Sequence, residues 1–394
     1  MVPRAPLCLA LVLASGPGAL LAQEGEVAAL IARIEAPQSP NRGGLDGLTL
    51  TEVMQRFRLP AVSIAVVKDF KIHWARAYGI ADVETGQLAD TATIFQAGSI
   101  SKPVFAMTAV KVAQEGRLSL DADVNTLLRS WQVPRNASTG EQPVTLRSLL
   151  SHTSGADDGF GFPGYNPGDP QPTLVQILSG EKPSNVGAVR FGRPPYTGFK
   201  YSGGGLVLAQ LAVMDVVGRP FDAIARDLVL APLGMRSSTY EQPLPAAFAG
   251  RAARGHSGGG RRMGAPWHDY PEQSAAGLWS TPSDLARFLI EMQRAIRGPA
   301  GAVLAQGAAR EMLTPTGIGE QGLGLAIKQQ GEGWYFSHSG SNWNFRADLV
   351  GHLRKGYGVV IMTNSENGWG VIVELEARIA AAYNWDSLHK PIPR

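Results

Sequence analysis

The sequence predicts an α+β fold in which an antiparallel sheet, built from both ends of the chain, is flanked by helices and interrupted by an all-helical insertion. Strand-like apolar runs gather near residues 61–79 and 334–363, whereas helical periodicity dominates the region between them. A further helical run follows the last of these strands. We therefore expect one domain, with its sheet part at about 48–95 and 320–385 and its helical part at about 96–319.

The composition is typical of a globular protein and argues against several function classes. Hydrophobic residues make up 44% of the 394 residues and charged residues 18%. The net charge of +3 comes from 36 basic and 33 acidic residues that are mixed along the chain without a basic stripe, so we predict no nucleic-acid partner. The histidines lack metal-binding spacing, and no phosphate-binding or dinucleotide fingerprint occurs, so we predict no metal and no cofactor. The oligomeric state is left open.

The first 22 residues have the features of an export signal. Arg4 precedes an apolar stretch that ends at Ala22 and is followed by polar residues 23–26. The short apolar length and its Gly/Pro break disfavour an uncleaved membrane anchor. Cys8, the single cysteine, lies in this segment, so a mature chain of residues 23–394 would have neither disulfides nor a thiol nucleophile. We expect a bacterial protein that is periplasmic or secreted, without a stable membrane span after cleavage.

The individual elements follow from periodicity and from the turn residues between them. A linker rich in Pro, Gly and Asn is predicted at residues 37–47, and a long loop after residue 155 carries aromatic side chains that favour the rim of a site. The predicted helices cover residues 26–36, 48–57, 144–150, 206–217, 221–230, 283–296 and 371–383. The predicted strands cover residues 61–67, 72–79, 91–97, 334–337, 345–351 and 358–363.

A serine and a lysine stand at the predicted start of another helix. Apolar residues recur at helical spacing from Phe105 until Gly116, and Pro103 fits the first turn, where its missing N–H costs little. Ser99 is then at the helix N-terminus and Lys102, three residues later, is on the same face. A hydroxyl there has an amine neighbour, free backbone N–H groups and the positive end of the helix dipole, which are ingredients of an acyl-transfer site. Serine also caps many helices, so this stretch alone leaves both interpretations open.

Two further stretches supply side chains that could complete such a site. Tyr201 stands immediately before a predicted helix, beside three glycines that permit close backbone approach. A phenol that acts as a base needs nearby positive charge, which Lys102 could supply. His338 continues the alternation of the predicted strand 334–337 and is followed by Ser339 and Gly340, and this glycine would let a substrate lie against the strand edge. The alternatives are that Tyr201 packs the helix entrance and that His338 is a sheet histidine bonded to a carbonyl.

One further serine matches a known pattern without its structural context. The pentapeptide GHSGG at residues 255–259 fits the G-x-S-x-G elbow, which is useful only on a tight turn between a buried strand and a helix. Residues 246–254 show no strand pattern, and residues 260–264 cannot start a helix. We therefore expect Ser257 to lie in a loop and to have no catalytic role.

Three motifs, in this order, resemble those of the serine β-lactamase-related superfamily: S-x-x-K at 99–102, Y-S-G at 201–203 and H-S-G at 338–340. This superfamily includes class C β-lactamases, low-molecular-weight penicillin-binding D-Ala-D-Ala peptidases, D-aminopeptidases and family VIII carboxylesterases. The resemblance extends over roughly residues 50 to 385 and implies the β-lactamase/DD-peptidase fold. Other segments similar to family signatures are residues 60–69, 77–86, 151–155, 232–235 and 277–286.

The resemblance implies a role for each matched residue. Ser99 would be the acylated nucleophile, and Lys102 and Tyr201 would share the proton transfer, with Lys102 desolvated at the helix N-terminus and so poorer at holding its proton. The backbone N–H groups of Ser99 and Ser341 would form the oxyanion hole. The residues implied to line the substrate site are His338, Ser339, Gly340 and Gly203.

Two departures from the family pattern bear on the substrate. Gly203 stands where β-lactamases usually have an asparagine that grips the acyl-amide group of the substrate. His338 stands where they usually have a lysine that binds the substrate carboxylate, and histidine is mostly neutral at pH 7. Both changes weaken recognition of an anionic amide.

We therefore expect a small-molecule ester as the substrate of a β-lactamase-like carboxylesterase. The alternatives, in order, are a D-Ala-D-Ala carboxypeptidase or D-aminopeptidase acting on a short peptide, and then a β-lactamase. A catalytically silent penicillin-binding-like protein is the non-enzyme alternative, although the joint retention of Ser99, Lys102 and Tyr201 argues for an active enzyme.

Overall fold

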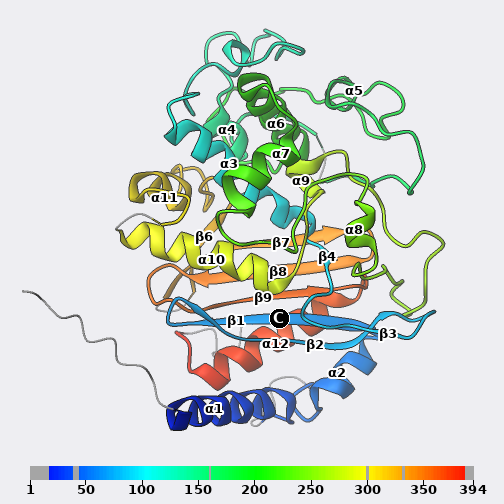
Figure 1. The fold of residues 1–394 in the computed structure, drawn as a ribbon. Helices are drawn as coiled ribbons and strands as arrows, with labels where there is room; N and C mark the ends of the chain where they lie inside the picture. The colour runs from blue at the N-terminus through cyan, green and yellow to red at the C-terminus, as the bar shows by residue number, and fades with distance from the viewer. Residues whose placement is uncertain (1–16, 39–43, 159–160, 299–300, 331–332, 387–394) are drawn as a thin grey trace, which may run out of the picture.

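An antiparallel sheet joins the two ends of the chain. The computed structural model describes residues 17–38, 44–158, 161–298, 301–330 and 333–386. Within these residues one seven-stranded sheet has the order β3-β2-β1-β9-β8-β7-β6, and each neighbouring pair is antiparallel (Figure 1). Its strands are β1 (Ala61–Lys68), β2 (Lys71–Asp82), β3 (Gln87–Leu88), β6 (Ala326–Gln330), β7 (Gly333–Asn342), β8 (Phe345–His352) and β9 (Gly358–Thr363).

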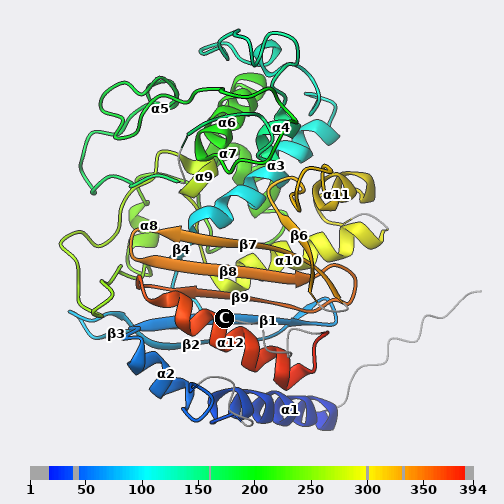
Figure 2. The same ribbon diagram turned by 180° about the vertical axis from the view of Figure 1, so that it is seen from behind.

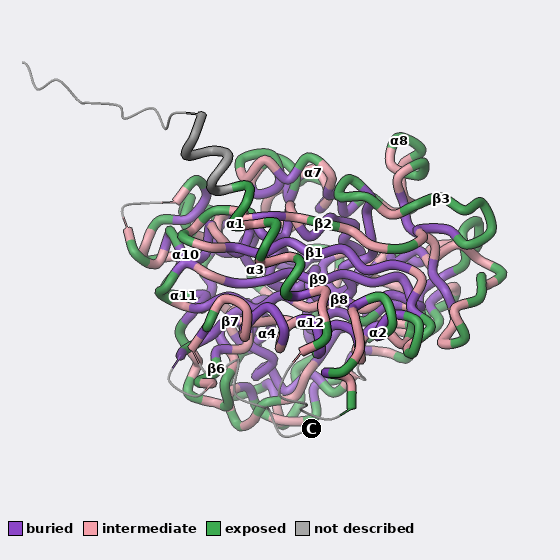
Figure 3. The backbone as a smooth tube through the Cα atoms, turned by 90° about the horizontal axis from the view of Figure 1, so that it is seen from below, coloured by how far each residue is buried: buried purple, intermediate pink, exposed green. Residues whose placement is uncertain are grey.

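The interior strand β1 is buried on both faces and lies between two hydrophobic cores. Its residues alternate, as the two-residue period of a strand requires. Val62, Ile64 and Val66 belong to one core, whereas Ala61 and Ala65 belong to the other. Figure 3 shows the neighbouring strands β9 and β8 buried along with β1. A sheet covered on both sides in this way is a rigid support for side chains at its edge.

Helices cover each face of this sheet (Figures 1 and 2). On one face, α12 (Gly368–Tyr383) packs against β8 and β9, and α1 (Pro17–Glu35) packs against α12 and α2 (Leu50–Arg56). On the other face, α10 (Pro282–Arg297) packs against β1, β9 and β8.

The remaining helical part lies beyond the β7 side of the sheet. Its α-helices are α3 (Ser101–Gln114), α4 (Leu146–Leu150), α5 (Leu174–Ser179), α6 (Gly203–Val217), α7 (Phe221–Ala225), α8 (Ala246–Ala249), α9 (Gln273–Ala276) and α11 (Gln306–Leu313). The short elements there are the 3₁₀ turns η1 (Gly98–Ile100) and η2 (Val124–Thr126), the π-helical η3 (Arg226–Leu230), and a strand pair of β4 (Phe95–Gln96) and β5 (Trp279–Ser280).

Local capping explains where the principal helices begin and end. The Thr281 side chain accepts a hydrogen bond from the Asp284 N–H at the start of α10, and Pro282 occupies the first helical position. The Ser202 side chain does the same for the Gly205 N–H at the start of α6, and Gly218 ends that helix in the left-handed conformation. The Ser202 cap thus sets the start of α6 directly after Tyr201.

A buried arginine ties the terminal helices together. Arg378 of α12 is fully buried and donates a hydrogen bond from Nε to Glu374 Oε1 at 2.8 Å. Its other guanidinium nitrogens donate to carbonyl oxygens of the α1–α2 region, those of Ile34, Ala36, Leu45 and Leu48. A buried guanidinium is tolerable because each of its polar groups finds a partner.

The predicted sheet from both chain ends and the flanking helices are confirmed. The observed strand lengths differ from the predicted ones where they depend on a partner strand far along the chain. Residues 91–97 form only the two-residue strand β4, because β5 offers a partner of only two residues. Strand β7 runs past the predicted end at Ser337 to Asn342, since β8 pairs along its whole length. Strand β6 was not predicted. The inserted part is also not purely helical, and α10 lies on the sheet rather than within that part.

The expected export signal, residues 1–22, lies largely outside the described residues, which begin at Pro17. Helix α1 begins there and continues past the expected cleavage position after Ala22. Export therefore stays a prediction. Among the described residues no single helix is long and apolar enough to cross a membrane. The pair Gly203–Val217 and Phe221–Leu230 reaches that length and composition jointly, with a bend of 78°.

Replacing Arg378 with alanine should strongly destabilise the fold. The substitution leaves the Glu374 carboxylate buried without its ion pair and removes the donor from four carbonyls. We expect the free energy of unfolding to fall by about 3–5 kcal/mol in urea denaturation. Arg310→Ala, at an exposed position of α11, is the control. A loss below about 1 kcal/mol for Arg378→Ala would contradict this account of the α1–α12 contact.

Candidate active site

A buried lysine is hydrogen-bonded to a partly exposed serine at the start of helix α3. Ser99 lies in the 3₁₀ turn η1, and Lys102 is the second residue of α3, so the two side chains meet as their spacing predicted. Lys102 Nζ lies 2.9 Å from Ser99 Oγ and 2.7 Å from the carbonyl oxygen of Ala275. Lys102 is only 1% exposed, so these contacts hold its amine in one place beside the hydroxyl.

The Ser99 turn packs directly against strand β7. Gly98 has a φ of +53°, and a Cβ there would lie 2.6 Å from the backbone nitrogen of Ser341. A Cβ at Gly340 would lie 2.0 Å from the carbonyl oxygen of Ala97. Glycine at both positions is therefore required for the two backbones to approach so closely. The sequence predicted that Gly340 would let a substrate lie against the strand edge; in the structure, the space of its missing side chain is taken by the Ala97 carbonyl.

Along residues 340–341 the edge of β7 contacts the turn η1 and not a further strand. Strand β6 pairs with β7 only from Gly333 to Ser337. The next residues pair with β8 on one side, and Ser339 and Ser341 are exposed. The backbone nitrogens of Ser99 and Ser341 thus belong to two segments in contact. A carbonyl oxygen between such groups can be polarised by two N–H donors.

Tyr201 reaches the same place from the start of helix α6. Its ring centre lies 5.0 Å from Lys102 Nζ and 6.2 Å from the ring of His338. The next residue, Ser202, caps the helix and hydrogen-bonds to the carboxylate of Asp158, which also accepts the Gly204 N–H at 2.6 Å. The structure therefore brings together all three stretches that the sequence singled out.

His338 adds a neutral ring to the site. Burial and the positive charge of Lys102 lower the pKa of His338 to about 3. Its Nδ1 lies 2.6 Å from the Ser339 carbonyl oxygen, so the neutral ring donates its proton there. At pH 7 this histidine supplies no fixed positive charge.

One residue of the site was not predicted. His152 stacks on Tyr201 with ring centres 4.3 Å apart and an interplanar angle of 28°. Its Nδ1 accepts the Ser202 N–H at 3.1 Å, which places the proton of the neutral ring on Nε2. Burial, followed by the charge of Lys102, lowers the pKa of His152 well below its ordinary value. The signal in the sequence was the segment 151–155, which resembled a family signature but carried no assigned role.

The second candidate serine has no comparable surroundings. Ser257 lies in a loop, as predicted, and its Oγ accepts the backbone N–H of Arg261 at 3.3 Å. The adjacent His256 turns its ring to the Asn364 carbonyl and the Val83 N–H. Neither contact activates the Ser257 hydroxyl.

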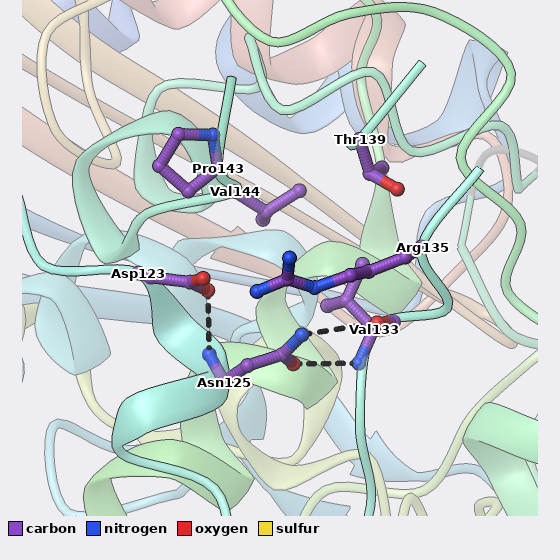
Figure 4. Close-up of a pocket in the computed structure, with 7 residues that line it drawn as sticks. All are labelled: Asp123, Asn125, Val133, Arg135, Thr139, Pro143 and Val144. Carbon is purple, nitrogen blue, oxygen red and sulfur yellow. Dashed lines mark hydrogen bonds between the residues drawn. The ribbon is translucent and has the colours of Figure 1, made fainter. Parts of the chain in front are cut away.

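A surface hollow in the helical part is separate from this site (Figure 4). Its polar groups bond to one another, since Asn125 Nδ2 and Oδ1 pair with the backbone of Val133 and the Asn125 N–H donates to Asp123. The hollow is not lined by Ser99, Lys102 or Tyr201; its lining residues are Asp123, Asn125, Val133, Arg135, Thr139, Pro143 and Val144. In the described part of the chain, no three His, Cys, Asp or Glu side chains are grouped to hold a metal ion.

Known proteins are similar to this chain in sequence and in fold. A model of the family described as "Beta-lactamase" matches residues 49–383. Esterase EstB of Burkholderia gladioli is 31% identical over 215 residues, which cover 52% of this chain and 53% of that esterase. The chain thus spans about half the length of this relative, and its matches span smaller shares of several others.

Two solved structures illustrate the shared fold. The octameric penicillin-binding protein homologue from Pyrococcus abyssi has a TM-score of 0.69 at 24% identity, over 87% of this chain and 78% of that one. The D-amino acid amidase from Ochrobactrum anthropi has a TM-score of 0.67 at 22% identity, over 90% and 99%. At these identities the likeness shows the fold alone. The family match over most of the chain confirms the resemblance found in the sequence: the protein belongs to the β-lactamase family.

Proposed function

We propose that this protein is a serine hydrolase that cleaves carboxylic esters through an acyl-enzyme on Ser99. The observation that carries the proposal is the 2.9 Å contact between Ser99 Oγ and the amine of buried Lys102. A serine hydroxyl is a weak nucleophile until a neighbouring group takes its proton. The family match and the similarity to an esterase support hydrolysis as the reaction class.

The proposed reaction has two steps. Ser99 Oγ attacks the ester carbonyl carbon while its proton passes to the pair Lys102 and Tyr201, which accepts it either as a neutral amine beside a phenol or as an ammonium beside a phenolate. The N–H groups of Ser99 and Ser341 stabilise the negative charge that develops on the carbonyl oxygen. The C–O bond then breaks, and the departing alcohol takes up the proton. A water molecule attacks acyl-Ser99 in the same way, which releases the carboxylic acid and restores the serine.

Two features of the site favour an ester over an anionic amide. His338 is neutral at pH 7, because burial and the charge of Lys102 lower its pKa, so it offers no fixed cation for a substrate carboxylate. Gly203 has no side chain that could bond an acyl-amide group. An ester requires neither anchor. A peptidase and a β-lactamase are the competing activities, in that order.

A comparison of three substrates tests this ranking. We expect kcat/KM to be highest for a short-chain nitrophenyl ester, lower for a D-Ala-D-Ala peptide, and lowest for a chromogenic cephalosporin. Ser99→Ala should abolish all three activities, and Ser257→Ala, in the loop without catalytic neighbours, should retain them. If the ester is the poorest of the three substrates, the proposed specificity is wrong.

The neutral state of His338 predicts how stability changes with pH. The pKa of this residue is lowered to about 3 in the folded chain, against an ordinary value of 6.5. Between these pH values the unfolded chain binds more protons at this position, so its stabilising contribution is complete above the ordinary value and is lost as the pH falls.

We therefore expect the free energy of unfolding of His338→Gln to decline less steeply than that of wild type between about pH 7 and about pH 4. Urea titrations at several pH values measure both slopes. Ser339→Ala, at the neighbouring exposed position, should parallel wild type. Equal slopes for wild type and His338→Gln would show that His338 is not held neutral by the fold.

A further inference from the structure

We propose that Phe162 forms an apolar wall of the substrate site, in the space where a side chain at position 203 would lie, and that this wall selects esters with a hydrocarbon or aromatic acyl group. The inference rests on the proposed ester hydrolysis at Ser99 and names the class of ester. It assigns to one aromatic residue of the long loop a role that the sequence only suggested in general terms.

The geometry that carries the proposal is the contact between Phe162 and the first residue of α6. A Cβ built on Gly203 would lie 2.8 Å from Cε2 of the Phe162 ring, and 3.4 Å from Cζ. The backbone of Gly203 is not in the left-handed region, so a larger residue there would not strain the backbone and would instead have to displace this ring. Gly203 is two residues from Tyr201, whose ring lies beside the Lys102 amine. The phenyl ring thus occupies the place of a side chain at position 203, which the resemblance to the family puts beside the substrate.

The loop holds Phe162 on both sides. Before it, Asp158 accepts the Gly204 N–H at 2.6 Å, which attaches the loop to the start of α6. After it, Tyr165 and Asp269 exchange two backbone hydrogen bonds of 2.9 and 2.7 Å. Phe162 itself is half-buried and packs against the main hydrophobic core. The side chain is thus held by the core and is not fully buried.

The chemistry of this wall differs from that of an amide side chain. A phenyl ring offers no strong hydrogen-bond donor or acceptor, so an acyl-amide group placed against it would lose its bonds to water without replacement. An aliphatic or aromatic acyl group gains by burying its surface there. Phe199, which is 42% exposed, lies edge-on to His152, the ring that stacks on Tyr201, and so supplies a further apolar side chain near Tyr201.

The first test compares acyl groups with the leaving group held constant. Nitrophenyl acetate and nitrophenyl hexanoate give a ratio of kcat/KM values for each variant. We expect wild type to prefer hexanoate and Phe162→Ala to lower the hexanoate-to-acetate ratio by about tenfold. Phe162→Leu, which keeps apolar volume, should lie between them and guards against misfolding of the alanine variant. Phe248→Ala, a half-buried phenylalanine on α8, is the matched control and should keep the wild-type ratio.

A second test asks whether the two positions act together. Gly203→Ala should lower the ratio in the wild-type background, because the new methyl group must displace the ring. The same substitution in Phe162→Ala should have no further effect, because the space is then empty. Independent effects of the two changes would contradict the proposed contact.

Reaction with fluorophosphonates of short and long alkyl chain separates this inference from the proposed function, since it requires no turnover. A long-chain preference in labelling of Ser99 that is lost in Phe162→Ala supports the wall even if esters prove poor substrates. A ratio unchanged by Phe162→Ala and Phe162→Leu in both assays overturns the wall and leaves ester hydrolysis intact. A chain that reacts with none of the reagents overturns both.

Discussion

The close packing of the Ser99 turn on the edge of strand β7 is the constraint on which the site depends. Gly98 and Gly340 make it possible, because a Cβ at either position would overlap backbone atoms of the facing segment. Strand β7 belongs to a sheet that is covered on both faces, so the turn rests on a rigid edge. The nucleophile that we propose and both N–H groups of the proposed oxyanion hole are thus set by one backbone contact.

Burial, followed by the charge of one amine, sets the electrostatics around this turn. Lys102 is nearly fully buried, and its charge contributes to lowering the pKa values of both His152 and His338. Two neutral rings therefore surround Tyr201, one stacked on it and one facing it. A site with neutral histidines suits a substrate without a carboxylate, which is the physical basis of the proposed preference for esters.

Local sequence patterns predicted the parts of the structure that local interactions decide. Ser99 and Lys102 are three residues apart at a helix start, and Tyr201 precedes a capped helix, so their placement follows from short-range rules. The order of the three motifs predicted that these groups meet. The bounds of α10, to within one residue, and the consecutive strands β1 and β2 were predictable for the same reason.

Contacts between distant segments were not predictable in this way. The five-residue strand β6 has no clear alternation and owes its conformation to pairing with β7. The stacking of His152 on Tyr201, and the contact of Phe162 with Gly203, join loops to a helix start far along the chain. Such contacts follow from the assembled fold, and they are the ones that surround the candidate site.

Trapping of the covalent intermediate is the most direct test of the central claim. Wild-type protein is mixed with a nitrophenyl ester, quenched in acid during turnover, digested and examined by mass spectrometry. The account predicts one acyl group per chain, on the peptide that contains Ser99. An acyl group on the peptide that contains Ser257, or continued turnover with no acylated peptide, would contradict it.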